Sequence, residues 1–146
     1  MSTVRARVDI AAPVEVVFDF FDDLANASVL VPSLDDVTRV TPLPAGGRRV
    51  EYVTRGRGGV RHEASSEHLV YDPPRRTVTR TVQSGIEAVA TREFTPTATG
   101  TRVDASVAWS VPVRYVAGLV SAPLRRPYRR ALRDGLEAAR AALEVD

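Results

Sequence analysis

The chain has 146 residues, of which 44% are hydrophobic and 26% are charged, and it contains no cysteine. This length suits one domain that buries a core without metal or disulfide support, so we treat residues 1–146 as a single domain. The lack of thiols excludes disulfide scaffolds, zinc sites with cysteine ligands and thiolate catalysis. All twenty basic residues are arginines, yet the net charge is only +2, so we do not expect nucleic-acid binding.

The sequence also lacks signals for a membrane or for export. No apolar run approaches the roughly eighteen residues that a membrane span needs, and residues 1–5 lack the apolar stretch of a signal peptide. We therefore expect a cytoplasmic protein with no membrane span, either a monomer or a homodimer.

The first segment alternates apolar and polar residues, which predicts a half-buried strand over residues 3–10. Pro13 then suits the first turn of a helix, and the apolar residues that follow it recur at helical spacing as far as Phe21. A second short helix is predicted over residues 24–31, because the proline at position 32 disfavours a helical residue before it.

From about residue 36 to residue 111 the sequence consists of runs rich in Val and Thr that are separated by turn residues. This spacing is typical of strands that follow one another in an antiparallel meander. The turn signals lie at residues 44–47, 56–59, 72–75, 84–85 and 95–100.

The C-terminal segment returns to helical spacing, with Leu132, Leu136 and Leu143 on one side and arginines on the other. Pro123 and Pro127 should kink or break the first part of this helix, so the regular helix is predicted to begin near Tyr128. A curved sheet with one apolar face must be covered, and this helix is the available cover. A single helix cannot fill the concavity of such a sheet, so a pocket is expected between them.

Three short motifs, in this order along the chain, resemble one family. They are IAAPVEVVF at residues 10–18, YDPPRR at residues 71–76 and GTRV at residues 100–103. The pattern is similar to the START-like (Bet v 1-like, SRPBCC) superfamily, of the polyketide cyclase/dehydrase type. The resemblance implies an α+β helix-grip fold, in which a seven-stranded curved antiparallel sheet wraps around a long C-terminal helix and two short helices separate the first two strands. It also implies a cavity for a hydrophobic ligand, without a metal or another cofactor, and it carries over no catalytic residue.

The turns fix which residues pair across the sheet, and pairing fixes the faces. The apolar core residues among the paired positions mark the inward face of the sheet. The turn at residues 72–75 then places Val70, and every second residue before it, on the same face. Pairing does not assign a face to residues 48–56, because the glycine-rich turn after them can hide a bulge. The predicted pairs are Thr81 with Ala88, Thr79 with Ala90, Thr77 with Arg92, and Phe94 with Val103.

The middle of the inferred inward face consists of small and polar residues. Small residues leave volume unfilled, which protein interiors do not normally tolerate, and a ligand-sized cavity explains them. The side chains predicted to contact the ligand are those of His62, Ser66, Thr79, Thr81, Ala88, Ala90 and Trp109.

His68 and Arg92 are the candidates for catalysis. The ordinary pKa of histidine suits a base near neutral pH, so His68 is the candidate base. Arg92 is the candidate that stabilises an oxyanion or a carboxylate, unless it pairs with an acid such as Glu51. A structural interpretation also stays open, with His68 hydrogen-bonded in the core and His62 solvated at a strand end. The two histidines lie roughly 20 Å apart on one strand, at about 3.3 Å per residue, so they cannot share a metal.

The leading functional hypothesis is an enzyme of the polyketide cyclase or dehydratase type. In such chemistry a base removes a proton next to a carbonyl group, and a cation stabilises the enolate that forms. Two alternatives stay open: a non-catalytic carrier or sensor of a hydrophobic ligand such as a lipid, quinone or polyketide, and a partner-binding module that uses the basic C-terminal helix.

Overall fold

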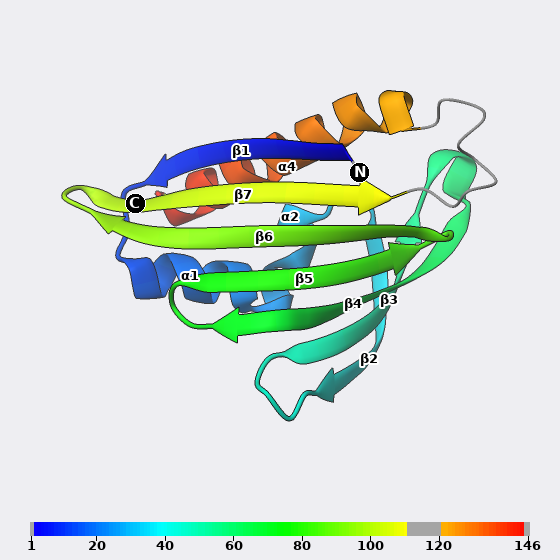
Figure 1. The fold of residues 1–146 in the computed structure, drawn as a ribbon, viewed down its shortest axis with the longest axis horizontal. Helices are drawn as coiled ribbons and strands as arrows, with labels where there is room; N and C mark the ends of the chain where they lie inside the picture. Colours follow the sequence, from blue (N-terminus) through cyan, green and yellow to red (C-terminus); the bar gives the residue numbers. More distant parts are fainter. Residues whose placement is uncertain (1, 111–120, 145–146) are drawn as a thin grey trace.

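The computed structural model describes residues 2–110 and 121–144, and it contains a seven-stranded antiparallel sheet with the helices on one side (Figure 1). The strand order is β1-β7-β6-β5-β4-β3-β2. The strands are β1 (Ser2–Ile10), β2 (Leu34–Pro42), β3 (Arg48–Arg55), β4 (Arg61–Asp72), β5 (Arg76–Gln83), β6 (Ile86–Thr97) and β7 (Gly100–Ser110). The helices are α1 (Val14–Asp22), η1 (Leu24–Asn26), α2 (Ala27–Leu30), η2 (Arg57–Gly59) and α4 (Ser121–Leu143). The predicted helix-grip architecture is confirmed.

The predicted register of the central strands is also confirmed. Thr81 pairs with Ala88, and Arg92 pairs with Thr77 on one side and with Ala105 on the other. A two-residue turn joins β5 to β6, and both of its residues have positive φ angles, 53° for Ser84 and 78° for Gly85. Such turns match the twist of the strands and set their register, so alternate side chains of β5 and β6 face the helices.

The prediction that Val70 faces inward is wrong. Between His68 and Val70 the register of β4 against β5 shifts by one residue, which leaves Leu69 as an extra residue in β4. A bulge of this kind exchanges the two faces of the strand beyond it. Val70 is 37% exposed as a result, and Tyr71 takes the inward position.

The prediction that the regular C-terminal helix begins near Tyr128 is wrong as well, because α4 runs from Ser121 and contains Pro127. A proline removes only one backbone donor from a helix, and packing can outweigh that loss. Here α4 packs along β1, and Arg125 donates a hydrogen bond of 3.0 Å to the carbonyl oxygen of Thr3. The start of the helix is therefore tied to the sheet on the N-terminal side of the proline.

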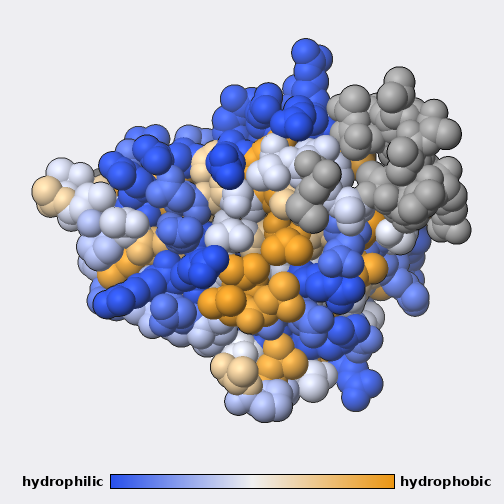
Figure 2. Space-filling view, viewed as in Figure 1, coloured by the Kyte–Doolittle hydropathy of each residue, from blue (hydrophilic) through white to orange (hydrophobic). Residues whose placement is uncertain are grey.

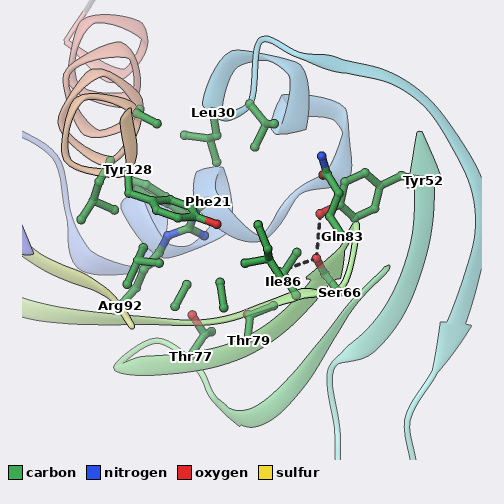
Figure 3. A pocket seen from close by; sticks show the side chains of 18 of the residues that line it. Phe21, Leu30, Tyr52, Ser66, Thr77, Thr79, Gln83, Ile86, Arg92 and Tyr128 are labelled. Carbon is green, nitrogen blue, oxygen red and sulfur yellow. Dashed lines mark hydrogen bonds between the residues drawn. The ribbon is translucent and has the colours of Figure 1, made fainter. Parts of the chain in front are cut away.

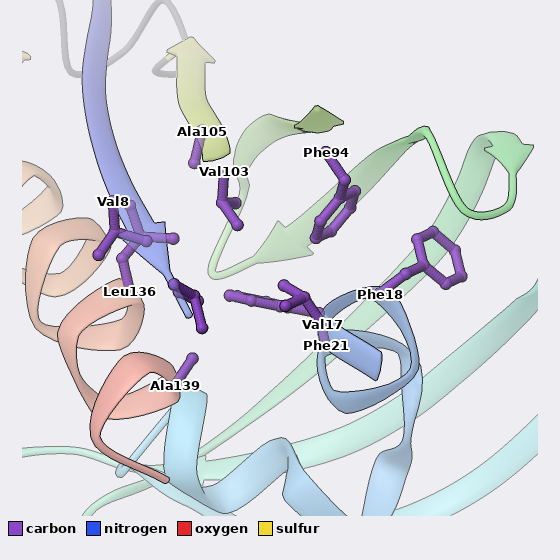
Figure 4. Close-up of a cluster of buried hydrophobic side chains, with 10 residues drawn as sticks. Val8, Val17, Phe18, Phe21, Phe94, Val103, Ala105, Leu136 and Ala139 are labelled. Carbon is purple, nitrogen blue, oxygen red and sulfur yellow. The ribbon is translucent and has the colours of Figure 1, made fainter. Parts of the chain in front are cut away.

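The apolar core lies at one end of the concave face, where α1 and the C-terminal half of α4 lie side by side against the sheet (Figure 4). The rings of Phe18 and Phe21 meet Phe94 edge-on, with centroids 5.2 and 5.6 Å apart. Leu136 is only 3% exposed, and Ala139 is fully buried. The core therefore fills the concavity beside the C-terminal half of α4 and leaves room beside its N-terminal half.

Charged side chains cover much of the opposite, convex face. Arg80 contacts Glu67 at 3.4 Å and Glu87 at 2.9 Å, which links three neighbouring strands. The side of the molecule seen in Figure 2 is mainly hydrophilic, with a hydrophobic patch near its middle. Among the described residues, no helix has the length and apolar character that crossing a membrane requires.

Candidate ligand-binding cavity

A cavity of about 610 Å³ lies between the concave face of the sheet and the helices (Figure 3). Its size is typical of small-molecule sites in proteins. The sheet contributes mainly small and hydroxyl-bearing residues, and the helices contribute mainly apolar ones. Of the residues predicted to contact a ligand or act on it, those that line the cavity are His62, Ser66, Thr79, Thr81, Ala88, Ala90 and Arg92.

Trp109 supports the cavity without lining it. Its side chain is 1% exposed, and its ring packs against that of Tyr128 with centroids 4.7 Å apart. Tyr128 lines the cavity, so the tryptophan lies behind it as part of the core.

His68 also lies outside the cavity lining. Its Nδ1 accepts a hydrogen bond of 3.0 Å from the backbone N–H of Arg48, so the neutral ring carries its proton on Nε2. Burial lowers the pKa of His68, and the nearby guanidinium of Arg48 lowers it further. The ring also lies against Gly47, where a Cβ would be 2.6 Å from Nδ1. These contacts favour a structural role, in which His68 holds the start of β3 against β4.

A polar network next to His68 joins the end of α1 to the sheet. Tyr71 donates a hydrogen bond of 2.6 Å to Asp22, and Arg48 contacts the other carboxylate oxygen at 3.4 Å. Arg48 also donates to the backbone carbonyl of Asp22. Burial and the Asp22 hydrogen bond raise the pKa of Tyr71 to about 12. The network therefore fastens α1 across the concave face.

Arg92 lies in the cavity beside an aromatic ring. Its guanidinium lies over the ring of Phe21, 5.0 Å from the centroid, which is a cation–π contact. Within the described part of the chain no carboxylate forms an ion pair with it. Burial lowers the pKa of Arg92, although a guanidinium stays protonated at ordinary pH.

The anticipated pairing of Arg92 with Glu51 does not occur. Glu51 lies on the other face of the sheet, where it contacts Arg39 at 4.0 Å. A buried cation without a counter-ion is unfavourable, and an anionic or carbonyl-bearing ligand would relieve that cost.

Three hydroxyl groups form a hydrogen-bonded chain in the cavity wall. The Ser66 hydroxyl lies 3.0 Å from that of Tyr52 and 2.8 Å from that of Thr81 (Figure 3). Sequence reasoning missed Tyr52 because it assigned no face to residues 48–56. In the structure Tyr52 pairs with Ala64, which puts it on the inward face.

His62 lies near the start of β4, close to the end of β3, where Gly56 leaves room for its ring. A Cβ at Gly56 would lie 3.2 Å from Nε2 of His62, and the Ser84 hydroxyl lies 3.5 Å from Nδ1. Both His62 and Ser84 line the cavity, so the imidazole is available to a ligand there.

The helices supply cavity residues that strand pairing could not reveal. Phe21 comes from α1, Leu30 from α2, and Tyr128 and Leu132 from α4. Their apolar, helix-spaced pattern was visible in the sequence, but the sequence does not state how each helix docks on the sheet.

A curved antiparallel sheet, closed by a C-terminal helix over a ligand-sized cavity, defines a helix-grip protein. Residues 1–144 match the family described as polyketide cyclase / dehydrase and lipid transport, and the chain belongs to this family. A comparison with curated proteins found no match.

Solved structures share the fold at low sequence identity. TTHA0849 from Thermus thermophilus has a TM-score of 0.78 and 19% identity, over 97% of each chain. The di-domain ARO/CYC StfQ from the steffimycin biosynthetic pathway has a TM-score of 0.81 and 17% identity, over 97% of this chain and 50% of StfQ. The di-domain ARO/CYC BexL from the BE-7585A biosynthetic pathway has a TM-score of 0.77 and 22% identity, over 99% of this chain and 50% of BexL.

Proposed function

We propose that this protein binds a polyketide-type substrate in the cavity and assists its ring closure or dehydration. The observation that carries the proposal is Arg92, a cation in the cavity with no acidic partner among the described residues. The family and the ARO/CYC folds support the same chemistry.

The proposed reaction begins with removal of a proton from a carbon between two carbonyl groups. The resulting enolate attacks a second carbonyl of the same chain, which forms a carbon–carbon bond and leaves an alkoxide. The alkoxide takes back a proton, and loss of water then completes a dehydration. Arg92 stabilises the negative oxygen at each stage, because a preorganised cation lowers the energy of developing charge.

His62 does not share this step with Arg92. It stands beside Ser84, just past the end of β5, whereas Arg92 pairs with Thr77, about 23 Å away along the strand at about 3.3 Å per residue. Nδ1 of His68 is occupied by the backbone of Arg48, so the proton passes to solvent water, and His62 contacts the distant end of the ligand.

A carrier of a hydrophobic ligand is the second candidate. The hydrogen bond between His68 and the Arg48 backbone favours this function, because it removes His68 as a base. Few titratable side chains are then left in the cavity lining to carry out catalysis. A carrier would bind the same molecule and leave it chemically unchanged.

The test uses the N-acetylcysteamine thioester of a linear poly-β-ketone, a soluble probe that also cyclises slowly without protein. Mass spectrometry should show faster closure and a narrower set of ring patterns when the protein is present. Arg92→Met should lose this effect, and Arg80→Met on the convex face should keep it. Closure at the protein-free rate, with the probe still bound, would leave the carrier as the function.

A further inference from the structure

The cavity has polar groups at two places that are separated along the sheet. Arg92 pairs with Thr77, whereas the hydroxyl chain ends at Thr81 on the same strand. These two positions on β5 are about 13 Å apart along the strand, at about 3.3 Å per residue. Ala90 lines the wall between them, and Ala88 lines it directly opposite Thr81. Figure 3 shows Arg92 and Phe21 on one side of the cavity and Ser66 and Tyr52 on the other.

The hydroxyl chain must have a hydrogen-bond donor left over. Tyr52, Ser66 and Thr81 have one hydroxyl proton each, and the two contacts between them use two of the three protons. Among the described residues no further acceptor for the third proton is found. All three side chains line the cavity, so the remaining donor is available to a ligand there.

The direction of the chain follows from the acidity of its members. A phenol is a stronger acid than an aliphatic alcohol, and it is therefore the better donor and the poorer acceptor. Tyr52 accordingly donates to Ser66. Accepting this bond makes the Ser66 hydroxyl a stronger donor, so we assign Ser66 as the donor to Thr81. The free proton is then that of Thr81, and the two hydrogen bonds behind it polarise the Thr81 hydroxyl and strengthen it as a donor.

We infer that the cavity selects an elongated, mostly apolar ligand with an anionic oxygen at Arg92 and a neutral carbonyl oxygen at Thr81. This inference rests on the proposed function and adds the orientation and the substrate class. An acid or enolate at one end of the ligand pairs with the Arg92 guanidinium, and a ketone at the other end accepts from the Thr81 hydroxyl. The alanine side chains of the cavity wall contact the apolar middle of the ligand.

The probes are an acetylnaphthoic acid, with its acetyl and carboxyl groups at opposite ends of the rings, and its isopropenyl analogue. The two have the same shape, but only the acetyl compound has a carbonyl oxygen for Thr81. Affinities are measured by titration calorimetry for the wild type, Thr81→Val, Tyr52→Phe and Arg92→Met. Thr91→Val is the matched control, because Thr91 lies between Ala90 and Arg92 on the convex side of β6 and is outside the cavity lining.

Thr81→Val should weaken the acetyl probe about 5- to 10-fold and leave the isopropenyl probe unchanged. Tyr52→Phe should have a smaller effect in the same direction, and Thr91→Val should have none. Arg92→Met should weaken both probes at least about 10-fold, because both have the carboxylate.

Two failures are distinguishable. If both probes bind and Ala90→Leu abolishes binding, but Thr81→Val affects them equally, the cavity binds ligands and the inferred carbonyl contact is wrong. If neither probe binds the wild type at any accessible concentration, both the inference and the proposed binding of such ligands in the cavity are overturned.

Discussion

Tyr71 and Asp22 lie 49 residues apart in the sequence and are joined by a hydrogen bond of 2.6 Å. The bond exists because Leu69 is an extra residue in β4, which turns Tyr71 toward α1 and Val70 away from it. One irregularity in a strand therefore creates the contact that fastens the first helix over the sheet. The same irregularity lies directly after His68, which still pairs with Thr79 in the regular part of β4.

The structural role assigned to His68 predicts a pH dependence of stability. In the unfolded chain the imidazole has an ordinary pKa near 6.5, whereas burial and Arg48 lower its pKa in the folded protein. The unfolded state therefore binds the proton more readily, and the free energy of unfolding should fall as the pH is lowered below about 6.5. The fall should end once the pH is below the folded-state pKa.

The variant His68→Asn isolates this effect, because its side-chain oxygen still accepts from the Arg48 backbone but does not titrate. Urea unfolding at about pH 7.5 and pH 5 should show a larger loss of stability in the wild type than in the variant. Equal losses in the two proteins would contradict the assignment.

The open space beside Ala90 predicts that a larger side chain is tolerated there. Ala90 lines the cavity, whereas Ala105 on the neighbouring strand is 4% exposed and belongs to the core. Ala90→Leu should leave the melting temperature nearly unchanged, and Ala105→Leu should overpack the core and cost about 1–3 kcal/mol. Thermal melts of the two variants measure this difference. A comparable drop in both would mean that the space beside Ala90 is not available.

The unpaired charge of Arg92 predicts that its removal does not harm the fold. Arg92→Met deletes a half-buried cation without an acidic partner among the described residues, so the free energy of unfolding should stay the same or rise. Arg48→Met is the contrasting variant, since it strands Asp22 and should cost about 1–3 kcal/mol. Denaturant midpoints compare the two, and a large loss in Arg92→Met would reveal an internal partner.

The turn between β6 and β7 predicts a glycine that cannot be replaced. A Cβ at Gly100 would lie 2.1 Å from the carbonyl oxygen of Ile10, which is backbone and cannot move aside alone. Single substitutions commonly cost about 0.5–3 kcal/mol. Gly100→Ala should cost at least the upper end of this range, or prevent the fold from forming. Gly58 has a positive φ angle as well but open space around it, so Gly58→Ala should cost only about 1–2 kcal/mol. Similar effects of the two substitutions would show that φ rather than the clash matters.

The sheet was predictable where short turns fix the register. A two-residue turn leaves only one pairing of β5 with β6, so the inward positions of Arg92 and Thr81 follow from the sequence alone. The position of Val70 was not predictable in this way, because no residue type marks Leu69 as the extra residue of a bulge.

The candidate site was predictable only in part, for the same physical reason. The glycine-rich connection after β3 hid the face of Tyr52, and without Tyr52 the hydroxyl chain could not be recognised. The contacts of His68 depend on the backbone of Arg48, which comes from a strand that sequence reasoning left without a register. The contact between the Phe21 ring and the Arg92 guanidinium depends on the position of α1 on the sheet. Strand pairing does not determine where a helix packs.

Side chains of β5 and β6 point alternately into the cavity and out to the convex face. The residues that determine ligand specificity are therefore different from those that form the outer surface. Thr81 faces the cavity, and its neighbour Arg80 contacts Glu67 and Glu87 on the convex face. A substitution at Thr81 or Ala88 therefore changes the shape and polarity of the cavity without altering an ion pair. New ligand preferences can arise by single substitutions at cavity positions of these strands, while the exterior and its charge stay as they are.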